Sequence, residues 1–154
     1  MVDTALVTGA AQRIGGEIVR ELHGAGFDIA LHYRRSTGAA KSLADELNTA
    51  RPGSCRLFQA DLAVGAELRR LGEELMAGYD TLDLLVNNAS GFEPTPIASC
   101  TVTEFDAMID SNLKGPYFLV QALLPMLRAA KGSIVNILDA HVEHPLPDFN
   151  AYCA

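Results

Sequence analysis

Near the N-terminus, glycines and an arginine are spaced in a way that suits the binding of a phosphate group. The run Gly9–Gly15 follows a short β-rich stretch, residues 3–8, and opens a helical pattern that ends at Gly26. A glycine turn between a strand and a helix lets backbone N–H groups approach a phosphate, and the helix dipole favours its negative charge. Arg13 replaces the usual central glycine of the turn. The pattern predicts a dinucleotide-binding turn that carries an additional positive charge.

The end of the second predicted strand, residues 27–33, indicates which dinucleotide binds. About twenty residues after the turn, an NAD site has an acidic residue for the ribose hydroxyl, whereas a 2′-phosphate favours arginine. Here the strand leads into Arg34, Arg35 and Ser36, with no acid at its end. With Arg13 across the same pocket, up to three guanidinium groups could meet one phosphate, which predicts NADP(H) over NAD(H). The alternative is that the arginines of this pair are ordinary solvated charges.

Beyond residue 36, helical and strand patterns alternate along the chain. We expect helices over residues 38–50, 63–78 and 103–130. We expect strands over residues 54–60, 82–86 and 133–138. This alternation predicts a Rossmann-type α/β fold, a doubly wound parallel sheet in a single domain spanning residues 1–154. Thr103 and Glu104 can cap the long helix, and Pro116 and Pro125 should bend it.

Polar residues follow the predicted strands at the end where ligands bind in such sheets. Asn87, Asn88 and Ser90 come at the end of the fourth strand, and Asp139 follows the fifth. Amide groups in this position should face the cofactor. Asn112 is an amide on an otherwise apolar stripe of the long helix, so it must find hydrogen-bond partners.

The composition limits the classes of function. A net charge of −7 argues against nucleic acid as a partner. No apolar run approaches the roughly 18–20 residues of a membrane span, and no leader opens the chain, so we expect a soluble, cytoplasmic protein. Cys55, Cys100 and Cys153 are too few and too scattered for a disulfide framework or a zinc cluster. The histidines lack ligand spacing, so no metal site is expected.

Five features of the chain together resemble the short-chain dehydrogenase/reductase family, in family order and at family spacing. They are Thr8–Gly9 with Gly15, the pair Asp61–Leu62, the run Asn87–Asn88–Ala89, Asn112, and Tyr152 thirteen residues after Asp139. The resemblance implies a parallel sheet of strand order 3-2-1-4-5, with the family's last two strands missing from this chain. It also implies an oxidoreductase that uses NADP(H) and acts on a small molecule, with neither a nucleic acid nor a membrane as partner.

Within that family, the details resemble pteridine reductases and dihydromonapterin reductases. These proteins have an arginine in the glycine turn, as at Arg13, and a phenylalanine two residues after a serine, as at Ser90 and Phe92. They also have an aspartate, here Asp139, where the family usually has a catalytic serine. The resemblance implies that Phe92 stacks on a pterin ring, that Ser90 contacts substrate and cofactor, and that the protein is a homotetramer.

Carried over onto this sequence, the resemblance assigns a role to each matching residue. The implied catalytic residues are Asp139, Tyr152 and Asn112, and the implied substrate contacts are Ser90, Phe92, Asp139 and Tyr152. The implied cofactor-binding residues are Gly9, Arg13, Ile14, Gly15, Tyr33, Arg34, Arg35, Ser36, Asp61, Leu62, Asn88, Ala89 and Ser90.

Reduction by hydride transfer also requires a proton donor. Tyr152 suits this role if its pKa is lowered, which a lysine ammonium would do. In the family that lysine lies four residues further on, beyond Ala154, so the 154-residue chain alone is expected to be inactive. Asp139 could hold Tyr152 by a hydrogen bond, or could donate the proton itself if burial raises its pKa.

The residues and the resemblance favour an NADPH-dependent reductase that converts a dihydropteridine to a tetrahydropteridine. One alternative is a carbonyl or 3-oxoacyl reductase of the same family. Another is a non-catalytic NADP-binding protein or an inactive fragment.

Overall fold

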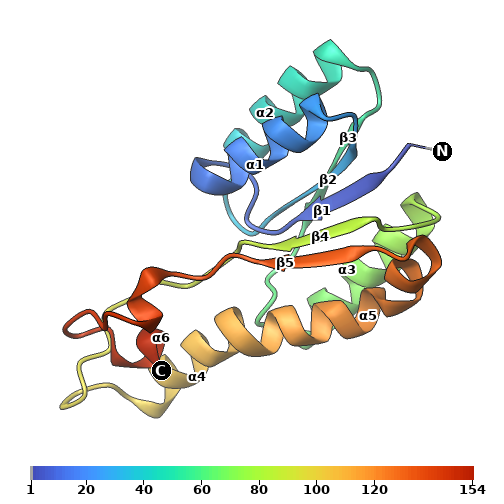
Figure 1. Ribbon diagram of the computed structural model, residues 1–154. Coiled ribbons are helices and arrows are strands. Elements are labelled where there is room, and N and C mark those ends of the chain that lie inside the picture. Colours follow the sequence, from blue (N-terminus) through green and yellow to red (C-terminus); the bar gives the residue numbers. More distant parts are fainter. Residues whose placement is uncertain (1) are drawn as a thin grey trace.

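The computed structural model describes residues 2–154, in which five strands form one parallel sheet (Figure 1). The strands are β1 (Thr4–Val7), β2 (Asp28–Tyr33), β3 (Cys55–Gln59), β4 (Leu84–Asn87) and β5 (Ser133–Asn136). Their order across the sheet is β3-β2-β1-β4-β5, and every neighbouring pair is parallel. The predicted doubly wound sheet and its strand order are confirmed.

Helices cover both faces of this sheet (Figure 1). On one face lie α1 (Arg13–Gly24) and α2 (Thr37–Ala50), and on the other lie α3 (Gly65–Gly78) and α5 (Gly115–Ala130). Strands β1, β2 and β4 are buried on both faces, so their sequences are largely apolar at successive positions, whereas β3 is partly exposed and the edge strand β5 is exposed.

Strand β1 shows how one strand contributes to both cores. Ala5 and Val7 pack in the core with Val19 of α1, whereas Leu6 packs in the opposite core with Leu71 of α3. All of these side chains are fully buried. The carboxyl end of this central strand is therefore held firmly between its neighbours, and the glycine turn starts from that end.

The long helix predicted for residues 103–130 consists of three consecutive segments. From α4 (Val102–Ile109) the chain passes through a π-helical turn, η1 (Asp110–Lys114), into α5. Pro116 lies in the first turn of α5, where the missing N–H group is tolerated, and Pro125 lies inside the helix. In residues 2–154, no helix is both long and apolar enough to cross a membrane.

The residue that caps α4 is Thr101, not Thr103 as predicted. The backbone N–H of Glu104 donates to Oγ1 of Thr101 at 3.3 Å, and the backbone N–H of Thr101 donates to Oε2 of Glu104 at 2.8 Å. This reciprocal pair is a capping box. The N-cap therefore lies two residues earlier in the chain than predicted.

After β5 the chain forms a 3₁₀ turn, η2 (Ala140–Val142), and a short helix, α6 (Asn150–Cys153). The backbone N–H of Thr95 donates to the carbonyl of Asp148 at 2.6 Å, and the N–H of Ala151 donates to Oγ1 of Thr95 at 3.0 Å. These bonds tie the end of the chain to the loop that follows β4.

The capping box predicts unequal effects of two neighbouring substitutions. Thr101→Ala should lower the free energy of unfolding by about 1 kcal/mol, because the cap is lost. Thr103→Ala should change it by less than about 0.5 kcal/mol, since that side chain is exposed. Urea unfolding of both variants measures the difference, and equal effects would contradict the assignment of the cap.

Candidate active site

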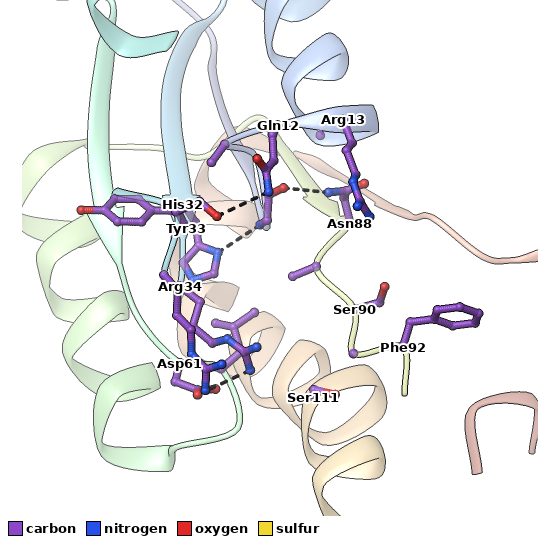
Figure 2. A pocket seen from close by; sticks show the side chains of 18 of the residues that line it. Gln12, Arg13, His32, Tyr33, Arg34, Asp61, Asn88, Ser90, Phe92 and Ser111 are labelled. Carbon is purple, nitrogen blue, oxygen red and sulfur yellow. Dashed lines mark hydrogen bonds and ion pairs between the residues drawn. The ribbon is translucent and has the colours of Figure 1, made fainter. Parts of the chain in front are cut away.

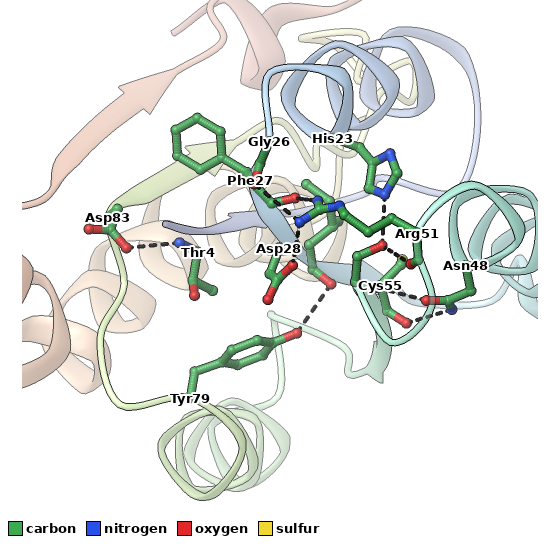
Figure 3. Close-up of polar contacts among 12 residues, drawn as sticks. Thr4, His23, Gly26, Phe27, Asp28, Asn48, Arg51, Cys55, Tyr79 and Asp83 are labelled. Atoms are coloured by element: carbon green, nitrogen blue, oxygen red, sulfur yellow. Dashed lines mark hydrogen bonds and ion pairs between the residues drawn. The ribbon is translucent and has the colours of Figure 1, made fainter. Parts of the chain in front are cut away.

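A cavity of about 650 Å³ lies at the carboxyl ends of β1, β2, β3 and β4 (Figure 2). It is lined by every residue that the sequence assigned to cofactor or substrate binding: Gly9, Arg13, Ile14, Gly15, Tyr33, Arg34, Arg35, Ser36, Asp61, Leu62, Asn88, Ala89, Ser90, Phe92, Asp139 and Tyr152. Residues that the sequence analysis did not assign to the site also line it, among them Gln12, His32 and Ser111. Segments far apart in the chain thus meet around one space.

The glycines of the first turn are required by close backbone contacts. Gly9 has φ of +62°, and a Cβ placed there would lie 2.9 Å from Cα of Ala89. A Cβ at Gly15 would lie 2.5 Å from the carbonyl oxygen of Gly9. Neither position accepts a side chain without movement of the backbone. The two glycines therefore let the turn pack closely on itself and on the segment after β4, and both line the cavity.

Thr8 and Asn88 fasten this turn to the segment after β4. The Thr8 hydroxyl donates to the carbonyl of Val86 and accepts from the backbone N–H groups of Asn88 and Ala89, each at 3.0 Å. The Asn88 side chain donates to the carbonyls of Thr8 and Gly9 at 2.9 and 3.2 Å. The predicted cofactor residue Asn88 thus also holds the two sides of the cavity together.

His32 on β2 is a buried residue of the site that the sequence analysis did not single out. Only 2 % of its side chain is exposed. The backbone N–H of Gly9 donates to its Nδ1 at 3.2 Å, and its Nε2 lies 3.0 Å from the carbonyl of Ala60. Desolvation lowers the pKa of His32 to about 4. Its position in a buried strand, directly before Tyr33 and Arg34, is the signal that could have identified it.

The guanidinium groups occupy separate parts of the cavity. Figure 2 shows Arg13 beside Asn88, whereas Arg34 is directed toward Asp61. Nη1 of Arg34 lies 3.7 Å from Oδ2 of Asp61. Both arginines line the one cavity, and their convergence on a single phosphate stays a prediction. In the arrangement seen here they can also serve two anionic groups of one extended ligand.

Arg13 and Ile14, the first two residues of α1, differ from ordinary helix residues in backbone conformation and in exposure, respectively. Arg13 has φ of +54°, a left-handed conformation that is unfavourable for a side chain other than glycine or asparagine. Ile14, an implied cofactor-binding residue, is 64 % exposed and lines the cavity. The buried residues of α1 are Gly15, Gly16 and Val19.

Asp139 and Tyr152 form a hydrogen-bonded pair at one side of the cavity. The Tyr152 hydroxyl donates to Oδ2 of Asp139 at 3.0 Å, and the backbone N–H of His141 donates to Oδ1 at 3.0 Å. Both bonds lower the pKa of Asp139, and the bond from His141 has the larger effect. The side chain of Asp139 is exposed. The pKa of Tyr152 is raised, mainly by burial and to a smaller extent by the hydrogen bond to Asp139. In this arrangement Asp139 holds Tyr152, and the condition for Asp139 as donor, a pKa raised by burial, is not met.

Phe92 faces the same pair and is 47 % exposed. Its ring stacks on Phe149 with centroids 4.3 Å apart and meets the edge of Tyr152 at 4.9 Å. Phe149 was not predicted as part of the site. It lies three residues before Tyr152, on the short segment that Thr95 ties to the loop carrying Phe92.

Asn112 does not line the cavity. It lies in the π turn, where its Oδ1 accepts from the backbone N–H of Gly91 at 2.6 Å and its Nδ2 donates to the Gly91 carbonyl at 3.0 Å. These bonds provide the partners that its amide needs. Asn112 therefore supports the loop of Ser90 and Phe92 from outside, and the neighbouring Ser111 lines the cavity.

Comparison with known proteins identifies the family. Residues 3–154 match the sequence profile of the family described as short chain dehydrogenase. The chain belongs to this family. Members of the family are oxidoreductases that use NAD(P)H, which agrees with the glycine turn and the cavity. The resemblance inferred from the sequence is confirmed at this level.

Three curated relatives show how far the similarity extends. Pteridine reductase 1 of Leishmania tarentolae is 33 % identical, over 96 % of this chain and 64 % of that protein. A 3-oxoacyl-[acyl-carrier-protein] reductase, FabG, of Staphylococcus epidermidis is 33 % identical over 89 % and 56 %. Nodulation protein G of a Rhizobium species is 33 % identical over 97 % and 60 %. The chain thus spans about three fifths of the length of these relatives.

Burial of His32 predicts a dependence of stability on pH. Its pKa is about 4 in the folded chain against 6.5 when exposed, so between these values the unfolded chain binds a proton that the folded chain excludes. The contribution is fully present above pH 6.5 and is lost as the pH falls to 4. The free energy of unfolding should decrease by about 3 kcal/mol across this window from His32 alone.

Urea unfolding at several pH values measures this decrease. His32→Asn removes the titrating group, and its stability should fall less steeply with decreasing pH than that of the unmodified protein. Parallel pH profiles for the two proteins would contradict the prediction.

Proposed function

We propose that the protein is an NADPH-dependent reductase that converts a dihydropterin to a tetrahydropterin. The observation that carries this proposal is the grouping of Phe92, Tyr152 and Asp139 at the cavity whose other side is the glycine turn. A flat apolar ring and a hydrogen-bonded acid pair suit a bicyclic heteroaromatic substrate that needs both stacking and a proton. The similarity to a pteridine reductase supports the same substrate class.

The residues around the cavity fit a phosphorylated dinucleotide. Gly9 and Gly15 have no room for a Cβ, and the first N–H groups of α1, which begins at Arg13, have no partner within the helix and would bind a pyrophosphate. Arg34, Arg35 and Ser36 at the end of β2 would hold the 2′-phosphate of NADPH. On a chain of net charge −7, these arginines supply the local positive charge that such a ligand needs.

The protein's chemical task is the handling of one proton. The balanced reaction is dihydropterin plus NADPH plus H⁺ giving tetrahydropterin plus NADP⁺, in which bound NADPH supplies the hydride. Since its pKa is raised, Tyr152 keeps its proton at neutral pH. Its hydroxyl donates to Asp139, so a substrate nitrogen that gains negative charge must compete with that carboxylate for the proton. Until that transfer, the hydrogen bond to Asp139 holds the Tyr152 phenol in place.

The second candidate is reduction of a carbonyl or a 3-oxoacyl group. The observation in its favour is the similarity to FabG at the same identity as to the pteridine reductase. In this case Tyr152 would donate to a carbonyl oxygen, and the charge of Asp139 would have no special role. The non-catalytic alternative is weakened by the direct Tyr152–Asp139 hydrogen bond, which a simple binding protein does not need.

We also propose that the protein is a cytoplasmic homotetramer. Phe105 of α4 and Tyr117 and Phe118 of α5 expose large apolar surfaces, and these support assembly through the long helical region. Cys55, Cys100 and Cys153 are free, in keeping with a reducing compartment.

The cofactor assignment predicts a selective loss of affinity. Arg34→Ala and Arg35→Ala should each weaken NADPH binding by about 10- to 100-fold, because a charged hydrogen bond to the 2′-phosphate is lost. NADH binding should change little. Calorimetric titration measures both, with Arg69→Ala on the exposed side of α3 as the matched control. NADH bound as tightly as NADPH by the unmodified protein would refute the assignment.

Substitution of Asp139 separates the two candidate activities. In a pterin reductase, Asp139→Ser should lower kcat with dihydropterins by about 100-fold, whereas a carbonyl reductase should tolerate it. Asp139→Asn is the control, since it keeps an acceptor for Tyr152 but removes the charge. Steady-state oxidation of NADPH with dihydrobiopterin, dihydrofolate and a ketone measures these activities. Fast turnover of the ketone with no response to either pterin would exclude the proposed substrate class.

A further inference from the structure

One buried imidazole connects three segments that surround the cavity. His32 lies at the end of β2, its Nδ1 accepts from the N–H of Gly9, and its Nε2 contacts the carbonyl of Ala60 after β3. The backbone carbonyl of His32 also accepts from the N–H of Ala10 at 2.8 Å. Figure 2 shows the ring directed at the glycine turn, with Tyr33 next to it in β2 and Arg34 directly after the strand.

The two contacts of the ring permit a single neutral tautomer. The Gly9 N–H is a donor, so Nδ1 must carry a lone pair, and the Ala60 carbonyl is an acceptor, so Nε2 must carry the hydrogen. Asp61 is the charged group that acts on this ring from the adjacent loop. Burial of the ring excludes water from replacing either partner.

The contacts also decide which N–H groups of the turn face the cavity. Those of Gly9 and Ala10 are both directed to His32, through its ring and its carbonyl. Helix α1 begins at Arg13, and the first N–H groups of a helix have no partner within it. These later N–H groups are therefore the ones available to a phosphate.

We propose that His32 is a positioning residue for dinucleotide binding, which acts by holding Gly9 so that the start of α1 presents its N–H groups to the pyrophosphate. This inference rests on the proposed cofactor site but not on the pterin substrate. Because His32 lies beside Tyr33 at the end of β2, two residues before Arg34, and is bonded to the residue before Asp61, it also fixes the distance between the pyrophosphate end and the 2′-phosphate end of the site.

Two amide substitutions separate the two contacts of the ring. In His32→Asn the side-chain oxygen can take the place of Nδ1 and accept from Gly9, but the contact with Ala60 is lost. In His32→Gln the longer side chain can place its NH₂ group at Nε2 and donate to Ala60, but Gly9 loses its acceptor. A residue that merely fills the core would show no such asymmetry.

Dissociation constants for NADPH, measured by calorimetry on the whole protein, provide the test. We expect His32→Asn to remain within about threefold of the unmodified protein and His32→Gln to bind at least about tenfold more weakly. The KM for NADPH should rise in His32→Gln by a larger factor than kcat at saturating NADPH falls, and it should rise less in His32→Asn. Equal weakening in both variants, or full affinity in His32→Gln, would overturn the inference.

A measurement without substitution covers the case of a variant that fails to fold. Nitrogen-15 NMR of labelled histidines should show His32 with its proton on Nε2 at neutral pH, and the opposite tautomer would overturn the inference. If the unmodified protein binds NADPH but the two variants show no asymmetry, only the role of His32 is refuted. A protein that binds no dinucleotide refutes the proposed function as well, and one that shows the asymmetry but leaves dihydropterin unreduced refutes only the substrate.

Discussion

The site depends on one close contact, that between the turn after β1 and the chain after β4. Gly9 lies against Ala89 with no room for a side chain, and the Thr8 hydroxyl accepts two N–H groups from the other segment. Because β1 is the central strand, this contact fixes the glycine turn relative to the loop that carries Phe92. The glycine turn and the loop of Phe92 are therefore held together at this contact, and a change at Thr8 would disturb both.

The charges of the cavity are arranged for an extended ligand. Arg34 is partly offset by Asp61, which in turn accepts from the N–H of Ala63 through Oδ1. This contact directs Arg34 away from Arg13 and keeps two positive centres apart (Figure 2). A ligand with anionic groups at two separated points gains from both centres, whereas a small anion can reach one.

The strands and helices could be predicted because their apolar patterns reflect burial directly, as in β1 and α3. The cap of α4 could not, since both Thr101 and Thr103 have an acidic residue three positions later and only the longer Glu104 reaches back. His32 and Phe149 were missed for a different reason. Their partners, Gly9 and Phe92, are brought near by strand order and by the Thr95 contacts. The local pattern around His32 indicates a buried strand residue but not its contact with Gly9. The glycine turn, by contrast, is a local feature and was recognised.

The exposure of Asp139 bears on how a proton would reach a substrate. In the structure, hydrogen bonds from His141 and Tyr152 lower the pKa of this carboxyl, so it accepts and does not donate. Desolvation acts in the opposite direction on an acid. Phe92 contacts the same tyrosine that bonds Asp139, so the apolar ring and the hydrogen-bonded pair form one cluster at the side of the cavity. Because the pKa of Tyr152 is raised and that of Asp139 is lowered, Tyr152 is the member of this pair that carries a proton at neutral pH.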